Sequence, residues 1–141
     1  MFDLKFAEQS FGQILSGAPL TLLVGLGATF IGLVLAIIVV IVREKEIPVL
    51  NPIFATIVSF IRGTPILVQL YVVYYGLPRL LGWLAGTDTS PTGMPAILIA
   101  FTAYSLNAMA NLSESIRAAY HAVDPGQREA GLSVGMTPFT T

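Results

Sequence analysis

A long stretch without charge near the start of the chain restricts the possible folds more than any other feature. No Asp, Glu, Lys or Arg occurs from position 9 to position 42, and a helix that crosses a bilayer needs about 20 apolar residues. A first membrane-spanning helix is therefore predicted over residues 19–42. Charged residues make up only 11% of the chain, whereas roughly 25% is usual in soluble domains, so the chain is expected to lie in a lipid bilayer.

Two further apolar regions predict two further spans, over residues 52–77 and 94–117. Each is long enough to cross a bilayer as a helix. The predicted fold is all-α, a polytopic membrane protein with three transmembrane helices in this chain.

The positions of Arg and Lys predict the orientation of these spans. Loops rich in Arg and Lys stay in the cytoplasm, and the segment after the first span contains Arg43 and Lys45. Residues 43–46 are therefore expected inside the cell. With three spans, residues 82–93 are then outside, and the loop over residues 118–136 is again cytoplasmic.

The second predicted span contains an arginine and a proline. A charge at membrane depth is costly unless it faces protein or water, and Pro65 lacks the N–H that a helix needs. We expect the helix to kink or break at residues 62–64. Arg62 is expected inside the bundle, beside carbonyl groups freed by Pro65 or beside an acidic partner.

The third predicted span carries a polar face. Asn107, Asn111 and Glu114 are spaced four and three residues apart, so they share one side of a helix. Two interpretations stay open. These side chains line a substrate path, or they form hydrogen bonds between helices. Glu114 and Arg117 are also spaced to pair with one another.

Small residues recur every fourth position in the first span, at Ala28, Gly32 and Ala36, with Gly25 near the same face. Such a stripe lets another helix approach closely. The partner is either a helix of a second subunit or a helix of this chain, and packing within the chain is the more general explanation.

A short bounded helix is predicted in the polar segment that follows the third span, over about residues 125–134. Asp124 is a suitable N-cap and Pro125 suits the first helical position. Glu129 is expected in the first turn, where the helix dipole favours negative charge. Gly135 is placed to stop the helix.

Two motifs in this order resemble bacterial ABC importer permeases of the polar amino acid branch, whose substrates include His, Gln, Glu, Arg and opines. The pattern G-Q-x-E-A-G-x-x-x-G over residues 126–135 resembles the EAA loop, and F-I-R-G-T-P-x-L-V-Q over residues 60–69 is similar to the signature of the second span. There are two departures. Gly131 replaces the usual Ala, and Asn111 stands where Tyr is common.

The resemblance implies a MetI-like permease fold. About two further spans follow the EAA loop in that family, so the chain is expected to be C-terminally truncated, with Thr137 and Pro138 beginning the next helix. The implied location is the bacterial cell membrane, as a multi-pass protein. The implied partners are an ABC ATPase subunit dimer, a second permease subunit that is identical or homologous, an extracytoplasmic solute-binding protein and a polar amino acid substrate.

The resemblance also assigns residues to roles. The EAA loop forms the coupling helix that docks into the ATPase, and the residues expected to make this contact are Gly126, Gln127, Glu129, Ala130, Gly131, Val134 and Gly135. The residues proposed for the substrate path combine the second-span signature with the polar face of the third span. They are Arg62, Thr64, Pro65, Gln69, Asn107, Asn111 and Glu114.

Other kinds of chemistry have little support in the sequence. There is no P-loop pattern for nucleotide, no Cys for a thiolate metal site, and a single His at position 121. A net charge of −1 gives no reason to expect nucleic-acid binding. We therefore predict no catalytic residues, no metal and no cofactor, with ATP hydrolysis left to a separate subunit. The alternatives are an ATP-independent channel or transporter, and a permease fragment that does not transport.

Overall fold

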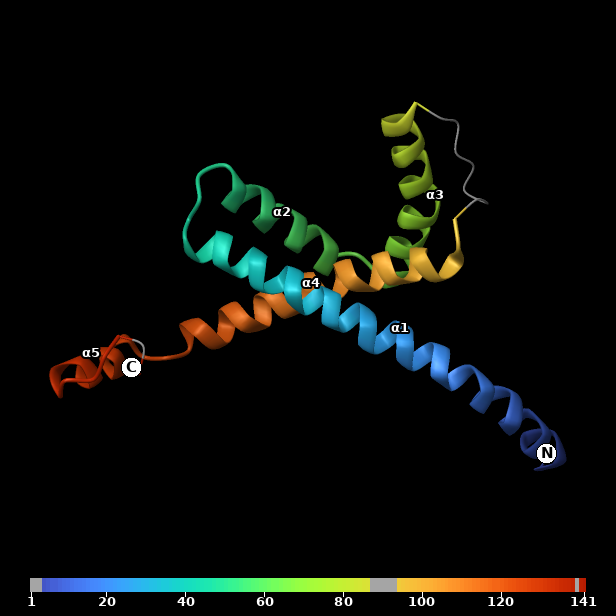
Figure 1. Ribbon diagram of the computed structural model, residues 1–141, viewed down its shortest axis with the longest axis horizontal. Coiled ribbons are helices and arrows are strands. Elements are labelled where there is room, and N and C mark those ends of the chain that lie inside the picture. Colours follow the sequence, from blue (N-terminus) through green and yellow to red (C-terminus); the bar gives the residue numbers. More distant parts are fainter. Residues whose placement is uncertain (1–3, 87–93, 139) are drawn as a thin grey trace.

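The computed structural model describes residues 4–86, 94–138 and 140–141, and over these ranges it contains helices and no strand (Figure 1). The helices are α1 (Leu4–Glu44), α2 (Leu50–Arg62), α3 (Ile66–Ala85), α4 (Ala96–His121) and α5 (Pro125–Ser133). The predicted all-α class is therefore confirmed. Within the predicted outside segment, residues 87–93 lie beyond the part of the chain that the structure describes.

The longest helix, α1, runs from Leu4 to Glu44 without interruption at Pro19, so it begins well before the predicted span. α1 and α4 are each long and apolar enough to cross a membrane, and α2 and α3 together make a third candidate that is bent by 115°. The described residues thus contain two candidate membrane spans, or three if the bent pair counts as one.

The break between α2 and α3 lies where Pro65 predicts it. α2 ends at Arg62, and α3 begins at Ile66 after Pro65, whose φ and ψ of −61° and 140° are extended. Proline favours a helix break at this point, because it has no N–H and its ring clashes with the preceding turn, although α1 continues through Pro19. The predicted kink is confirmed, but the predicted span over residues 52–77 falls on two separate helices.

The structure is organised around α1 and α4, which run in the same direction and cross near the centre of the molecule (Figure 1). Ala28 and Ala36 are 1% and 0% exposed. A Cβ added at Gly32 would lie 2.5 Å from Ala108 Cβ and 2.9 Å from the Ser105 carbonyl oxygen. The small-residue stripe therefore lets the two backbones approach closely within this chain, which is one of the two alternatives predicted for it.

A small hydrophobic core forms where α1, α2 and α4 meet, and Phe54 packs against its edge. Its members are Val39, Val58, Ile61, Met109 and Ala110. This core holds the last turn of α2 against the centre of α4, and so places the bend beside the polar face of α4. Many large apolar side chains elsewhere are exposed, including Phe30 at 68% and Trp83 at 79%, which is expected for surfaces that face lipid or other transmembrane helices.

Candidate functional site

The Gln69 side chain occupies the backbone groups that the bend leaves free. Its Nε2 donates to the carbonyl oxygens of Ile61 at 2.7 Å and Thr64 at 3.0 Å. In a continuous helix the Ile61 carbonyl would accept from the N–H of residue 65, and Pro65 has none. Gln69 therefore supplies a donor beside the Thr64 N–H and Thr64 Oγ1, which also reach the Ile61 carbonyl. This matters in a membrane because no water is available to satisfy a carbonyl group there.

The same glutamine connects the bend to α4. Gln69 Oε1 accepts from Asn107 Nδ2 at 3.2 Å, and Asn111 Nδ2 in turn donates to Asn107 Oδ1 at 3.2 Å and to the Asn107 carbonyl at 3.0 Å. We call this set, Thr64, Gln69, Asn107 and Asn111, the amide chain. It brings together four of the seven residues predicted for a substrate path, and Pro65 creates the bend at which they meet.

A cavity of about 180 Å³ lies beside the bend. Apart from two members of the amide chain its lining is apolar, and the lining residues are Phe60, Ile61, Thr64, Val68, Gln69, Val72, Val73, Ala103 and Leu106. The polar groups at its edge are neutral amide and hydroxyl groups, so this site offers hydrogen bonds but no formal charge.

Arg62 does not occupy the predicted position. Its side chain is exposed in this chain, and the carbonyl oxygens beside Pro65 that it was expected to bind are taken by Gln69. No ion pair joins Arg62 to the Glu114 carboxylate among the described residues. A neutral amide can enter the bend at lower desolvation cost than a guanidinium group, which explains why Gln69 rather than Arg62 is found there.

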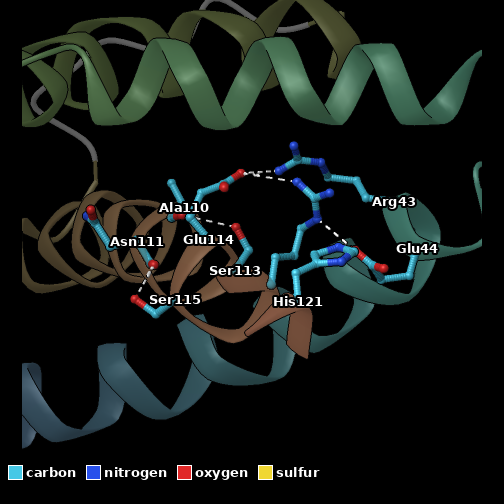
Figure 2. Close-up of polar contacts among 9 residues, drawn as sticks. Arg43, Glu44, Ala110, Asn111, Ser113, Glu114, Ser115 and His121 are labelled. Carbon is cyan, nitrogen blue, oxygen red and sulfur yellow. Dashed lines mark hydrogen bonds and ion pairs between the residues drawn. The ribbon is translucent and has the colours of Figure 1, made fainter. Parts of the chain in front are cut away.

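A second polar cluster joins the C-terminal ends of α1 and α4. Figure 2 shows Arg43 and Glu114 facing one another in an ion pair between these helices. Arg117 Nε lies 2.8 Å from Glu44 Oε1, and its Nη1 lies 3.9 Å from Glu114 Oε1. His121 Nε2 lies 3.1 Å from Glu44 Oε1. We call these five side chains the charge chain.

The pairing of Glu114 with Arg117 confirms the sequence-based prediction, but the residues from α1 were missed. The side chains of Arg43 and Glu44 are 11% and 22% exposed, whereas that of His121 is 57% exposed, so this is a linked and partly buried network and not a set of isolated surface pairs. One signal could have found it. The first and third predicted spans end on the same side of the membrane in the predicted orientation. Arg43 and Glu44 follow the first span, and Glu114 and Arg117 lie at the end of the third.

The short helix α5 begins and ends as predicted. Asp124 is the N-cap, and its Oδ1 accepts from the Gly126 N–H at 2.8 Å. Gly135 has φ +88°, a conformation that favours glycine. The Met136 N–H donates to the Gly131 carbonyl and the Gly135 N–H to the Leu132 carbonyl, each at 3.1 Å, which is the Schellman pattern of a helix end.

One detail of the α5 prediction was wrong. The first turn contains no acidic residue, because Glu129 is the fifth residue of a helix that starts at Pro125 and a turn takes 3.6 residues. No residue of α5 is buried, and Glu129, Ala130 and Val134 are all exposed. In Figure 1, α5 stands apart from the crossed helices, beyond the end of α4. Its outward face is therefore available to another molecule.

Similar proteins exist among curated sequences. The chain is 37% identical over 137 residues to the probable amino-acid permease protein YxeN of Bacillus subtilis, an alignment that covers 97% of this chain and 58% of the relative. It is also 37% identical over 136 residues to the L-cystine transport system permease protein TcyL of the same organism, covering 96% of this chain and 56% of the relative. No family model matches the chain.

A solved structure gives the same result for the fold. The chain superimposes with a TM-score of 0.77 on a chain described as belonging to the crystal structure of an amino acid ABC transporter with histidines, at 31% identity. The match covers 97% of this chain and 59% of the other. The chain thus spans somewhat less than three fifths of the length of the proteins to which it is similar.

Proposed function

We propose that this chain, which is related over almost its whole length to permease subunits of amino-acid ABC transporters, acts as a permease subunit of an ATP-driven importer for polar amino acids. It forms part of the translocation path and couples that path to an ATPase subunit. The chain itself contributes no hydrolytic step. Its place is the cell membrane of a bacterium.

The observation that carries this proposal is the exposed helix α5. A nine-residue helix with a side-chain cap at one end and a left-handed glycine at the other has a fixed length and direction. It buries none of its own residues, so its stability does not depend on packing within this chain. Such a helix suits a groove on a soluble partner, and the partner proposed here is the ATPase dimer.

The amide chain is the best candidate for contact with the substrate. A polar amino acid carries an ammonium group and a carboxylate, and amide groups can donate to one and accept from the other. Asn111 is exposed, whereas Gln69 and Asn107 are half-buried. Asn111 is thus the member most accessible to a passing solute, and the path itself is completed by a second permease subunit, with substrate delivered by a solute-binding protein.

The proposed orientation places residues 43–46 and 118–136 in the cytoplasm. It is supported by the charge chain, which holds the C-terminal ends of α1 and α4 together at one end of the molecule. Labelling of Lys45→Cys with a membrane-impermeant thiol reagent tests it, since the chain has no Cys of its own. We expect labelling only after the membrane is opened; strong labelling in intact cells would contradict the orientation.

The coupling role is tested by Glu129→Lys in membranes that contain the cognate ATPase. We expect normal insertion of the permease, loss of ATPase co-purification and loss of amino acid uptake. Glu46→Lys is the matched control, because it makes the same charge change in another exposed segment at the same end of the molecule. Normal ATPase binding by the Glu129→Lys variant would refute the role of α5, and uptake that persists without any ATPase would favour an ATP-independent transporter.

A further inference from the structure

The charge chain joins α4, which leads into α5, to α1, which packs beside α4. Its members follow one another in the order Arg43, Glu114, Arg117, Glu44 and His121, and the first four alternate in sign. Two belong to α1 and three to α4. We propose that Glu44 is a positioning residue for coupling: through Arg117 and His121 it ties α1 to the last turns of α4, so that a displacement of α5 moves both helices together. This inference rests on the proposed contact between α5 and an ATPase.

The location of Glu44 supports this role. Its Oε1 is shared by Arg117 Nε at 2.8 Å and His121 Nε2 at 3.1 Å, so one carboxylate binds two successive turns of α4. His121 is the last residue of α4, and α5 begins at Pro125. A force applied to α5 therefore reaches the His121 turn first, through a link of only three residues.

The rest of the α1–α4 contact is of a different kind. Around Gly32 it consists of small side chains packed against backbone, and such surfaces give close approach without directional bonds. Among the described residues, the side-chain hydrogen bonds that connect α1 with α4 all lie in the charge chain. The helices can slide along the small-residue stripe unless these bonds hold their register.

The connectivity of the network makes the tie effective. Arg117 touches both Glu44 and Glu114, and Glu114 also binds Arg43. Isolated exposed ion pairs contribute little, whereas several linked and partly buried charges contribute more. Removal of the Glu44 carboxylate leaves Arg117 with the longer contact to Glu114 alone and leaves His121 without an acid, so the end of α4 is released from α1.

The test measures uptake per ATP hydrolysed in the assembled importer. We expect Glu44→Ala to retain ATPase binding but to lose at least about fivefold in this ratio, the lower range of allosteric coupling. Glu46→Ala is the matched control, since Glu46 lies two residues away, is exposed and forms no side-chain hydrogen bond or ion pair among the described residues. An unchanged ratio in the Glu44→Ala variant would overturn the inference.

A reversible covalent tie separates transmission from folding. The double variant Glu44→Cys with Arg117→Cys removes the bond, and a short bis-thiosulfonate reagent then joins the two positions in a chain that has no other Cys. We expect the coupling ratio to fall in the double variant, to return on cross-linking and to fall again after reduction. A ratio that stays low in the cross-linked importer contradicts the inference.

Failure of the proposed function would look different. In that case the unaltered chain would not bind the ATPase. Uptake per ATP hydrolysed would then stay, in every variant, at the background measured with the ATPase alone. The tie itself is measured without ATPase by spin labels at Glu46→Cys and Ala118→Cys. We expect one narrow distance distribution that broadens when Glu44→Ala is added, and an unbroadened distribution would overturn the tie whatever the partner is.

Discussion

The two polar clusters of this chain both hold helices together, but with side chains of different chemistry. The amide chain lies at the bend between α2 and α3, beside an apolar cavity, and all its members are neutral. The charge chain lies at the ends of α1 and α4 and consists of ionisable side chains. Because a charge is far more costly to desolvate than an amide, a neutral cluster suits the packed bend, and a charged cluster suits the partly exposed ends of the helices.

The two clusters also differ in what they hold. Gln69 donates to the Ile61 and Thr64 carbonyls at the break made by Pro65, so the amide chain helps to satisfy a local break. The charge chain closes contacts between residues more than 70 positions apart in the sequence. Loss of the first should therefore disturb the fold at one place, and loss of the second should loosen two helices that are otherwise well formed.

The largest effect is expected from Gln69→Leu. The Thr64 carbonyl loses its donor, the Ile61 carbonyl loses the shortest of its hydrogen bonds and Asn107 loses an acceptor, and each unsatisfied buried group is destabilising. We expect the free energy of unfolding in mixed micelles to fall by about 3 kcal/mol. Gln13→Leu is the control, since this exposed glutamine of α1 has no side-chain hydrogen bond among the described residues. Equal loss in both variants would show that the bend does not depend on Gln69.

A smaller loss is expected from Glu114→Gln, which keeps an acceptor but removes the negative charge between Arg43 and Arg117. Hydrogen bonds to charged groups are stronger than neutral ones, and we expect the free energy of unfolding to fall by about 2 kcal/mol. The measurement is the same detergent titration, with Glu46→Gln as control. If the loss exceeded that of Gln69→Leu, the order of the two clusters in stability would be reversed.

A local effect is expected from Gly135→Ala. A side chain with Cβ is disfavoured at φ +88° by about 1 kcal/mol, so the end of α5 should open more often. Hydrogen exchange at the Met136 N–H, which binds the Gly131 carbonyl, should become about fivefold faster. Gly76→Ala is the control: it places the same methyl group in open space inside α3 and should leave this exchange rate unchanged. An unchanged exchange rate in Gly135→Ala would show that α5 does not end through the left-handed glycine.

The smallest effect is expected from salt. Between about 0.01 M and 1 M salt the screening length falls from roughly 30 Å to 3 Å. The loss caused by Glu114→Gln should then shrink by about 0.5 kcal/mol, because the charge chain is partly exposed. The loss caused by Gln69→Leu should stay constant, and a similar salt response in both variants would remove the distinction between a neutral and a charged cluster.

Much of the fold follows from local sequence. The absence of charge predicts α1, Pro65 predicts the break between α2 and α3, and Asp124 with Gly135 predicts the bounds of α5, since each acts on its own neighbours. The error at Glu129 is one residue, because Glu129 directly follows the first turn of α5. In contrast, the 115° bend and the capture of the Ile61 carbonyl by Gln69 depend on how the chain folds back after the break, which a linear pattern does not contain.

The polar residues were predicted as one set, but the structure divides them. Asn107, Asn111 and Glu114 share a face of α4, and this follows from helical spacing alone. Whether a side chain on that face meets Gln69 or Arg43 depends on which helix lies opposite at that height. The pairing of Arg43 with Glu114 needs the parallel alignment of α1 and α4, and that alignment is a property of the tertiary structure.

The parallel alignment has an electrostatic consequence of its own. Each helix carries roughly half a negative elementary charge at its C-terminal end, and two parallel helices bring two such ends side by side. Arg43 lies in the last turn of α1, and Arg117 lies one turn before the end of α4, where a cation offsets that partial charge. The same arginines that bind Glu114 and Glu44 therefore also balance the macrodipoles, and a neutral tie at this end would leave two like poles repelling one another.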